Sequence, residues 1–400
     1  MSRVVYVSTD PGVPVFGRKG ASVHVQSLVR ELVRRGHEVH LVTARVGGRT
    51  PRGLEDVVVH ELAPVTGADG AEREASARIS AESVLEVLDG LREVGGPDLV
   101  MERYALWSDA TMRWCAEQGV PSVLEVNAPL IDEQAEHRVL ADRDRAESIA
   151  ERAFGAATSI VCVTPAVADW VAARVSDDRH VHVVANGVDT RRVRPLEVPA
   201  APPAGEFTVG FVGTLKPWHG VEVLVRAFAR LADTVTGARL RVVGDGPQRE
   251  VIRTLVADLG IGDRVDLVGP VDPEEMPRQL AAMDVAVAPY PELADFYFSP
   301  LKIYEYLAAG LPVVASAIGE VPELLDDGDL GILVTPGSVA ELAAVLAGLA
   351  SEPAIREDLG RSARRAAVER HDWSCVLDRI LATVPEPTTT LADELLGRIA

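Results

Sequence analysis

Residues 298–310 combine the residue types that a helix needs to hold an anion at its first turn. Ser299 is a good helix cap, Pro300 suits the first helical position, and Gly310 suits the left-handed residue that closes a helix. These signals predict a helix that begins at Pro300 and ends at Gly310. The amides of its first turn and the positive end of its dipole would hold a phosphate without any metal.

Glu305 lies one turn into this predicted helix, on the same stripe as Leu301 and Ala309. An irregular, aromatic-rich segment from Tyr290 to Phe298 precedes the helix, and Glu305 could face the same opening as the first-turn amides. A carboxylate at this position could accept hydrogen bonds from the hydroxyl groups of a ligand. The pattern therefore predicts a site for a diphosphate with a hydroxyl-rich group, such as ribose, beside it.

Lys216 lies in a second loop of interest, Gly213 to Gly220, directly after a predicted strand. A lone lysine after a strand is often only a surface residue. Here the strand end and the flanking glycines favour a compact cation for phosphate oxygens, where it would stabilise a leaving group whose charge grows.

Three further glycine-rich loops give weaker signals. Gly20 precedes a helix start, so its amides could face an anion, but Gly12, Gly17 and Gly20 miss the dinucleotide-binding spacing. The loops containing Gly244, Gly246 and Pro247, and then Val271, could bind a planar base by backbone groups. A plain structural turn explains each of these loops equally well.

Three polar residues of the first half follow strands or begin a helix: His24, Arg103 and Asn127. We consider each a candidate for contact with substrate. The alternatives are a solvated or core-satisfied histidine at position 24 and a turn-forming asparagine at position 127.

These loops are positioned by short runs of Val, Ile and Leu that alternate with helical patterns, which is typical of parallel sheets with crossover helices. The predicted strands are Val4–Ser8, Val39–Thr43, Val57–Leu62, Leu99–Tyr104, Ser122–Val126, Ser159–Thr164, Val181–Ala185, Phe207–Val212, Leu240–Val243, Val265–Val268, Val285–Ala288, Val313–Ala315 and Ile332–Val334. The main predicted helices are Ala21–Arg35, Glu74–Glu93, Ser108–Gln118, Asp132–Phe154, Pro165–Arg174, Val221–Ala232, Gln248–Leu259, Pro273–Ala282, Pro300–Ala309 and Val339–Ser351. Ligands of such sheets bind at the carboxyl ends of the strands.

The alternation of predicted strands and helices stops at a proline-rich stretch and then resumes. In addition, 400 residues exceed what a single hydrophobic core normally holds. We therefore predict two doubly wound, Rossmann-like α/β domains that face one another across a cleft. The first is residues 1–190 on the acceptor side, 191–205 is a linker, and 206–370 is the donor-binding domain. Residues 371–400 are expected to be helices that pack back toward the first domain.

Composition excludes several classes of protein. The formal net charge of −20 argues against nucleic acid and against an anionic membrane surface. No apolar run reaches the ~18 residues of a membrane-spanning helix. The absence of a signal-like start and three scattered cysteines lead us to expect a cytoplasmic protein with reduced thiols. No spacing typical of a metal site is present, and oligomeric state is left open.

Taken in order, the loops resemble those of retaining nucleotide-sugar glycosyltransferases of family 4, which have the GT-B fold. The resemblance runs from Tyr6 to about Trp373. Its most specific parts are residues 299–316, 186–189, 213–220, 244–247 and 319–324, with residues 35–39 matching as well.

The sequence departs from the family's usual motif, two glutamates separated by seven residues. Glu305 matches the second glutamate, which in relatives holds the ribose hydroxyls, whereas Tyr297 stands where the first lies against the transferred sugar. Relatives also carry an Arg and a Lys after the first strand of the second domain. Here Lys216 supplies one cation, and Thr214 and His219 stand where others are expected.

The resemblance implies transfer of a sugar from a nucleoside diphosphate, with UDP as the default, to a hydroxyl of a soluble small-molecule acceptor, with retained configuration and without cofactor or metal. It implies catalytic roles for Lys216, Glu305 and His24, and acceptor contacts from Lys19, Arg103 and Asn127. The implied donor contacts are Gly20, Gly213, Thr214, Lys216, Gly244, Gly246, Pro247, Val271, Tyr297, Ser299, Pro300, Leu301, Lys302 and Glu305. The alternatives are an epimerase or phosphorylase on the same scaffold, and a non-catalytic nucleotide-sugar-binding protein.

Overall fold

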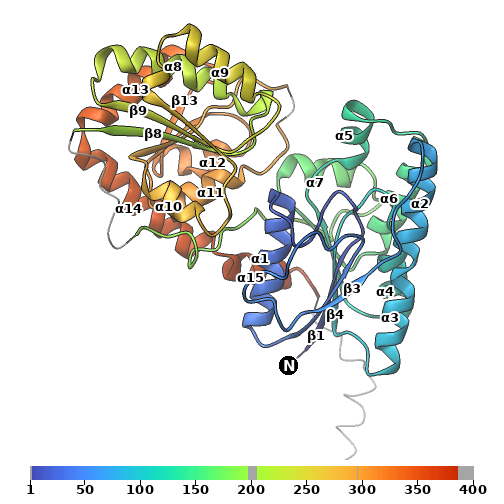
Figure 1. The fold of residues 1–400 in the computed structure, drawn as a ribbon. Coiled ribbons are helices and arrows are strands. Elements are labelled where there is room, and N and C mark those ends of the chain that lie inside the picture. The colour runs from blue at the N-terminus through green and yellow to red at the C-terminus, as the bar shows by residue number, and fades with distance from the viewer. Residues whose placement is uncertain (1, 197–204, 295, 386–400) are drawn as a thin grey trace, which may run out of the picture. The chain divides into compact units, whose positions relative to one another are not determined.

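The computed structural model describes residues 2–196, 205–294 and 296–385 of the chain. The chain forms two units, each built around its own parallel sheet (Figure 1). Unit 1 takes in Met1–Ala185 and Leu377–Ala400, and unit 2 is Asn186–Val376. The predicted fold class, two doubly wound α/β domains, is confirmed.

The sheet of unit 1 has the order β3-β2-β1-β4-β5-β6-β7, with parallel neighbours throughout the described ladders. Its strands are β1 (Arg3–Ser8), β2 (Glu38–Thr43), β3 (Val58–Glu61), β4 (Leu99–Arg103), β5 (Ser122–Val126), β6 (Ser159–Cys162) and β7 (Val181–Val183). Its helices are α1 (Gly20–Arg34), α2 (Gly70–Glu82), α3 (Val84–Glu93), α4 (Ala110–Gln118), α5 (Leu130–His137), α6 (Arg143–Ala156) and α7 (Pro165–Ala172). The strand order changes direction between β1 and β4, which is the usual place for a ligand.

The sheet of unit 2 has the order β10-β9-β8-β11-β12-β13 and is also parallel. Its strands are β8 (Phe207–Val212), β9 (Ala238–Val243), β10 (Val265–Gly269), β11 (Val285–Ala288), β12 (Val313–Ser316) and β13 (Ile332–Val334). The helices are α8 (Val221–Thr234), α9 (Arg249–Asp258), α10 (Met276–Ala281), α11 (Leu301–Ala308), α12 (Val321–Leu324), α13 (Val339–Ser351) and α14 (Pro353–Arg370), and α15 (Trp373–Leu381) follows. In this unit the order changes direction between β8 and β11.

The two longest predicted helices of unit 1 are each two helices, so these predictions were wrong in detail. Residues 74–93 are interrupted at Ser83, where α2 ends and α3 begins. Residues 132–154 are interrupted before Asp142, whose side chain accepts a hydrogen bond from the backbone N–H of Arg145 and caps α6. A capping aspartate inside a run of good helix formers starts a new helix because it satisfies that helix's first amides.

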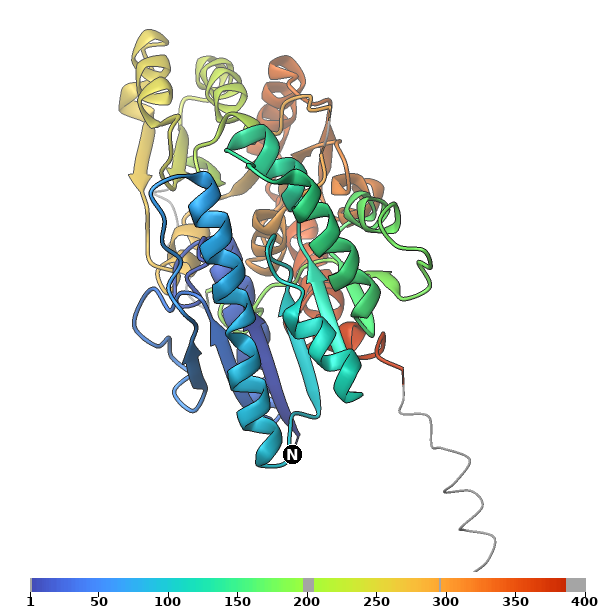
Figure 2. The same ribbon diagram turned by 90° about the vertical axis from the view of Figure 1, so that its right-hand side faces the viewer.

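Apolar side chains of strands and helices form the cores on which the loops stand. In unit 1, one face of the sheet packs on α3 and α4, and Figure 2 shows helices lying alongside these strands. This cluster consists of Val5, Val7, Val42, Leu62, Val84, Leu88, Leu91, Val100, Ala110, Trp114 and Cys115. In unit 2, Phe211, Phe228 and Leu346 belong to a larger cluster in which α8 and α13 pack on the central strands.

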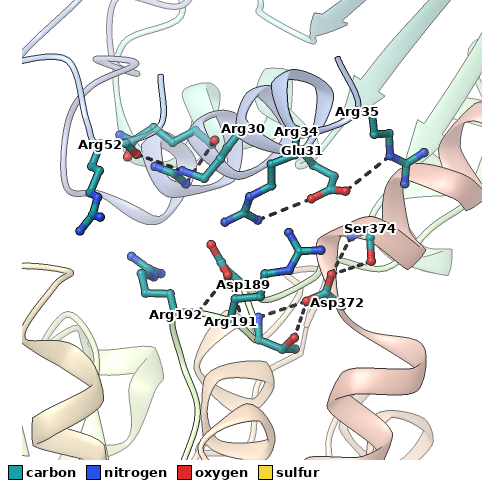
Figure 3. A network of polar contacts seen from close by, with 12 residues as sticks. Arg30, Glu31, Arg34, Arg35, Arg52, Asp189, Arg191, Arg192, Asp372 and Ser374 are labelled. Atoms are coloured by element: carbon teal, nitrogen blue, oxygen red, sulfur yellow. Dashed lines mark hydrogen bonds and ion pairs between the residues drawn. The ribbon is translucent and has the colours of Figure 1, made fainter. Parts of the chain in front are cut away.

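Two segments near the ends of unit 2 are paired with each other. The chain enters unit 2 at Asn186 and leaves it after Val376, and Val188 forms a β-bridge with Asp372. The carboxylate of Asp372 accepts hydrogen bonds from Thr190 and from Ser374 (Figure 3). Hydrogen bonds to Asp372 lower the pKa of this carboxyl, although its burial acts in the opposite direction.

The domain boundaries predicted from the sequence remain predictions, and two of their segments lie partly outside the described residues. Of the predicted linker 191–205, residues 197–204 lie outside them. The same is true of residues 386–400 in the predicted C-terminal helical segment 371–400. Within residues 205–385, α14 and α15 are described.

Candidate active site

The loops after β8 and β11 lie at the direction change of the unit 2 sheet. The loop after β8 is Gly213 to Gly220, and the segment after β11 leads through Tyr290 and Phe298 to α11. The phenolic oxygen of Tyr306 in α11 accepts a hydrogen bond of 2.8 Å from the N–H of Val212, at the end of β8. This hydrogen bond holds α11 against the end of β8, at the edge of the sheet where ligands of parallel sheets usually bind.

Gly244 and Gly246 are explained by packing between loops. The N–H of Gly213 donates to the carbonyl of Val243, and that of Leu215 donates to the carbonyl of Asp245, each at 3.0 Å. A Cβ atom at Gly244 would lie 2.0 Å from the carbonyl oxygen of Gly213, and one at Gly246 would lie 2.6 Å from that of Leu215. These two glycines thus let adjacent loops touch through their backbones, which supports the structural-turn interpretation. Pro247 is exposed and Val271 is half-buried in the neighbouring loops.

The segment before α11 is an aromatic cluster. The ring centroids of Phe296 and Phe298 are 4.3 Å apart, and that of Tyr290 lies 5.0 Å from Phe296. Tyr297 makes an edge contact with Phe298 and is half-buried. Tyr297, the residue in place of the family's first glutamate, is therefore part of an aromatic wall.

The predicted cap of α11 was wrong by one residue. Pro300 is the N-cap, with φ −80° and ψ 75°, and the helix begins at Leu301. Because Pro300 has no helical ψ, Ser299 is one residue too early to cap, and α11 has no side-chain cap hydrogen bond among the described residues. The hydroxyl oxygen of Ser299 is buried without a hydrogen-bond partner among them. Gly310 adopts the predicted left-handed conformation, with φ 71°.

Lys302, in the first turn of α11, is buried at 8% exposure. Its Nζ atom lies 4.8 Å from the ring centroid of Phe211 and 4.8 Å from that of Tyr290. A Cβ atom at Gly213 would lie 3.2 Å from Cε of Lys302, so the lysine passes alongside this glycine. Burial lowers the pKa of Lys302 to about 7.

Glu305 lies one turn further along α11, with 24% of its side chain exposed. The Nη2 atom of Arg192 lies 4.0 Å from Oε1 of Glu305. Burial raises the pKa of Glu305, and the charge of Arg192 opposes this rise. Sequence analysis missed Arg192, which lies three residues after the Asn186–Asp189 turn that we did single out.

Lys216 is half-buried in the loop after β8, with its Nζ atom 5.2 Å from the ring centroid of Trp218. The carbonyl of Thr214, itself exposed, accepts a hydrogen bond from Nδ1 of His219. Burial, together with the charges of Lys302 and Lys216, lowers the pKa of His219 to about 4. Both lysines are thus close enough to His219 for their charges to act on it.

Unit 1 contains a buried polar group at its own direction change. Nε2 of His24 in α1 lies 3.1 Å from Oε1 of Glu125, at the end of β5. The hydroxyl of Tyr6 in β1 donates to Oε2 of the same carboxylate at 2.5 Å. Burial alone would raise the pKa of Glu125, but His24, Tyr6 and the charge of Arg103 together lower it. His24 is therefore held by a carboxylate inside unit 1. This fits a core-satisfied histidine, and it also orients the ring as contact with substrate would require.

The other residues predicted to contact the acceptor substrate belong to the same unit. Arg103 ends β4, and its Nη1 atom is buried without a hydrogen-bond partner among the described residues. Lys19 is the exposed N-cap of α1, and Gly20 is the first residue of that helix. Asn127 follows β5 and donates a long hydrogen bond of 3.4 Å to the carbonyl of Glu125. In the part of the chain that the structure describes, the buried hydroxyls of unit 1 that lack hydrogen-bond partners include those of Ser8, Thr9 and Ser22.

Comparison with known proteins identifies the family. Residues 18–192 match the family described as Glycosyltransferase Family 4, and residues 206–352 match Glycosyl transferases group 1. A D-inositol 3-phosphate glycosyltransferase of Streptomyces scabiei is 30% identical over 394 residues, covering 91% of this chain and 85% of that protein. The chain is a family 4 glycosyltransferase. The resemblance stated from its loops is thereby confirmed, as is its assignment as an enzyme.

The names of other relatives of this glycosyltransferase describe different activities. An MMP alpha-(1->4)-mannosyltransferase of Mycolicibacterium hassiacum is 28% identical over 414 residues, covering 93% of this chain and 96% of that protein. Among solved structures, sucrose-phosphate synthase from Thermosynechococcus elongatus has a TM-score of 0.74 at 20% identity, with both chains covered completely. Anabaena HepE in complex with UDP has a TM-score of 0.71 at 20% identity, covering 95% of this chain and 99% of that one. These structures show that the glycosyltransferase has the GT-B fold.

Within the described residues, no helix of this glycosyltransferase is both long and apolar enough to cross a bilayer. A search of the same residues finds no group of three or more His, Cys, Asp or Glu side chains that could hold a metal ion.

Proposed function

We propose that this glycosyltransferase transfers a sugar from a nucleoside diphosphate to a hydroxyl of a small water-soluble acceptor, with retained anomeric configuration. UDP is the first candidate for the nucleotide. The observation that carries the proposal is the start of α11. It lies at the direction change of the unit 2 sheet, has no side-chain cap among the described residues, and is followed one turn later by Glu305. Solved HepE with bound UDP or UDP-glucose supports uridine as the base.

In the proposed reaction, the bond between the anomeric carbon and the phosphate oxygen breaks while the acceptor oxygen bonds to the same carbon. The acceptor proton passes to the departing phosphate, so no enzymic nucleophile is needed. The first-turn amides and the positive dipole end of α11 stabilise the charge that grows on this phosphate. Lys216 and Lys302 add positive charge nearby. In the proposed reaction these lysines stabilise the departing phosphate in the way that a bound metal ion otherwise would.

Glu305 is proposed to accept hydrogen bonds from the ribose hydroxyls, with Arg192 holding its carboxylate in place. Backbone groups of the loops after β8, β9 and β10 would contact the rest of the nucleotide. These contacts include those predicted for Gly213, Thr214, Gly244, Gly246, Pro247 and Val271. For Gly244 and Gly246 the contact is through the backbone, since the glycines themselves are needed for loop packing.

The polar group of unit 1 is proposed to bind the acceptor. His24, oriented by Glu125, would accept a hydrogen bond from an acceptor hydroxyl, and Arg103 would contact a polar or anionic part of the same molecule. Lys19 and Asn127 are placed at the neighbouring loop ends. The net charge of −20 favours a soluble acceptor over an anionic lipid carrier, and the three cysteines favour the cytoplasm.

The test is a screen of UDP-, GDP-, ADP- and dTDP-sugars for protection against thermal unfolding, followed by acceptor screening with the protective donor. We expect UDP-sugars to protect, and NMR of the product to show the donor's anomeric configuration. Glu305→Gln should weaken donor binding by about tenfold to a hundredfold, because each hydrogen bond to a carboxylate is worth about 1.5–3 kcal/mol. Glu357→Gln, which neutralises a carboxylate 74% exposed on α14, is the matched control and should bind normally.

Inverted products would contradict the proposal, as would normal donor binding by Glu305→Gln. Isomerisation or hydrolysis of the donor with no acceptor present would instead point to an epimerase-type reaction. Co-sedimentation of the protein with anionic vesicles at low salt would contradict the soluble acceptor alone.

A further inference from the structure

The ammonium group of Lys302 is buried in a place where the protein itself gives it no acceptor. It has neither a hydrogen bond nor an ion pair with any described residue, and Nζ is fully covered. An ammonium carries three N–H donors, and leaving them unmet in an apolar place is costly. Methionine would fill similar space without that cost. The lysine therefore needs an explanation that the surrounding side chains do not supply.

The walls around this ammonium are aromatic and neutral. Phe211 and Tyr290 each present a ring with its centroid 4.8 Å from Nζ, so cation–π attraction holds the group without satisfying its N–H donors. His219 is neutral at pH 7 because burial, with the charges of Lys302 and Lys216, lowers its pKa to about 4. Burial likewise raises the pKa of Tyr290, which keeps it uncharged. The closest carboxylate on the same helix, Glu305, is directed to Arg192.

The place itself is the anion-binding part of a parallel sheet. Lys302 belongs to the first turn of α11, which begins without a side-chain cap among the described residues, and the lysine passes alongside Gly213 at the end of β8. Any residue other than glycine at 213 would bring a Cβ to 3.2 Å from Cε of the lysine. Near Lys302, the hydroxyl of Ser299 is a second buried polar group without a partner among the described residues.

We propose that Lys302 is the principal cation that binds the donor's diphosphate, at the point where α11 begins and Gly213 leaves β8. This inference rests on the function proposed above and names the residue that performs its central step. A diphosphate supplies the acceptors that the ammonium lacks, and charge attraction is stronger there because water is excluded. Lys216, which is less enclosed, takes the secondary role.

The same position links diphosphate binding to a proton. Since burial lowers the pKa of Lys302 to about 7, the free enzyme loses this charge as the pH rises above 7, and binding of an anion restores it. His219 and Tyr290 stay neutral between pH 7 and 9, and Lys216 has the same sign of charge, so none of these neighbours replaces the lost charge. Affinity for UDP should therefore fall by up to tenfold per pH unit above 7.

The first experiment compares UDP with uridine by calorimetry. In Lys302→Met, the affinity for UDP should fall at least tenfold and its decline between pH 7 and 9 should disappear, while uridine binds as in the wild type. Lys302→Arg should recover part of the affinity but not the pH dependence, since arginine stays charged. Arg226→Met removes an exposed cation of α8 and should change neither ligand. Equal affinity of Lys302→Met and wild type for UDP would overturn the proposal.

The second experiment follows the lysines of the intact wild-type chain and uses variants only to assign the signals. The chain has three lysines, Lys19, Lys216 and Lys302, so labelling lysine Cε with carbon-13 gives three signals, assigned with Lys216→Met and Lys302→Met. The signal of Lys302 should titrate near pH 7 and move to higher pH with UDP. If UDP binds and only the Lys216 signal responds, Lys302 is not the diphosphate ligand. If the wild type binds no nucleoside diphosphate at all, the proposed function falls together with this inference.

Discussion

The Nζ atom of Lys302 lies equally far, 4.8 Å, from the ring centroids of Phe211 and Tyr290. Two aromatic faces thus take the place of the water or carboxylate that normally surrounds an ammonium. This arrangement favours the neutral amine in the free protein, and it has consequences for stability that are separate from ligand binding.

Lys302→Met should make the free enzyme more stable. The pKa of Lys302 falls from 10.5 to about 7 on folding, so below pH 7 the folded state carries a buried charge that the unfolded state carries in water. This costs on the order of 5 kcal/mol of stability. As pH rises from 7 to 10.5 the folded group is neutral and the unfolded group still charged, so the wild type gains stability.

Urea unfolding of wild type and Lys302→Met at pH 6 and pH 9 measures this effect. The variant should be the more stable at pH 6, and the difference should shrink at pH 9. A variant that is less stable than the wild type at pH 6 would show that the ammonium has a partner in the folded state.

Gly246→Ala should destabilise unit 2 through a backbone clash. Its Cβ would lie 2.6 Å from the carbonyl oxygen of Leu215, a backbone atom that cannot move aside easily. We expect a loss of about 1–3 kcal/mol. Gly262→Ala is the control, since nothing lies within 4 Å of its Cβ, and it should stay within about 0.5 kcal/mol of the wild type. Thermal unfolding compares the two, and equal stability would rule out the tight loop packing.

His24→Leu should be strongly destabilising because it leaves the Glu125 carboxylate buried with Tyr6 as its hydrogen-bond donor. Loss of one partner of a buried pair costs about 3–5 kcal/mol. Since the folded pKa of Glu125 lies below 4.5, the wild-type pair contributes stability above that pH, and this contribution is lost as the pH falls through the folded pKa.

The measurement is the free energy of unfolding between pH 3 and 7 for His24→Leu, with Tyr6→Phe as the milder comparison. Removing only the Tyr6 hydroxyl should cost about 1–2 kcal/mol. If His24→Leu is as stable as the wild type at pH 7, the pair is not a structural unit.

Thiol reagents should distinguish the three cysteines. Cys115 and Cys162 are buried, and burial raises the pKa of both thiols, that of Cys162 to about 12. Cys375 is half-buried. At pH 8 the folded protein should therefore react quickly at Cys375, and Cys115 and Cys162 should react only in denaturant. Mass spectrometry locates the label, and rapid labelling of Cys162 in the folded chain would contradict its burial.

The fold could be predicted from the sequence because parallel strands are buried on both faces and appear as short apolar runs. Ser122–Val126, Phe207–Val212 and Val285–Ala288 match the observed strands at both ends. The helix breaks at Ser83 and before Asp142 were missed, since helix-forming residues continue through both. The cap of α11 was misplaced because Pro300, with ψ 75°, is itself the N-cap and not the first helical residue.

The site was predicted only in outline. The sequence indicated α11, Glu305 and the loop after β8, but it favoured Lys216 over Lys302 as the cation. Lysines are rarely buried, and no local pattern showed that the side chain at 302 would pass between two rings. The pair of His24 and Glu125 joins residues 101 positions apart, and Tyr6 is 119 positions from Glu125, so sequence spacing alone could not bring them together.

The bridge between Val188 and Asp372 has a consequence for how such enzymes diversify. It holds the entry and the exit of one uninterrupted stretch, Asn186–Val376, side by side. Such a stretch can be exchanged as one unit for the corresponding stretch of a relative, because its two junctions lie side by side in the structure. We expect chimaeras spliced at these junctions to inherit donor preference from the exchanged stretch and acceptor preference from the host.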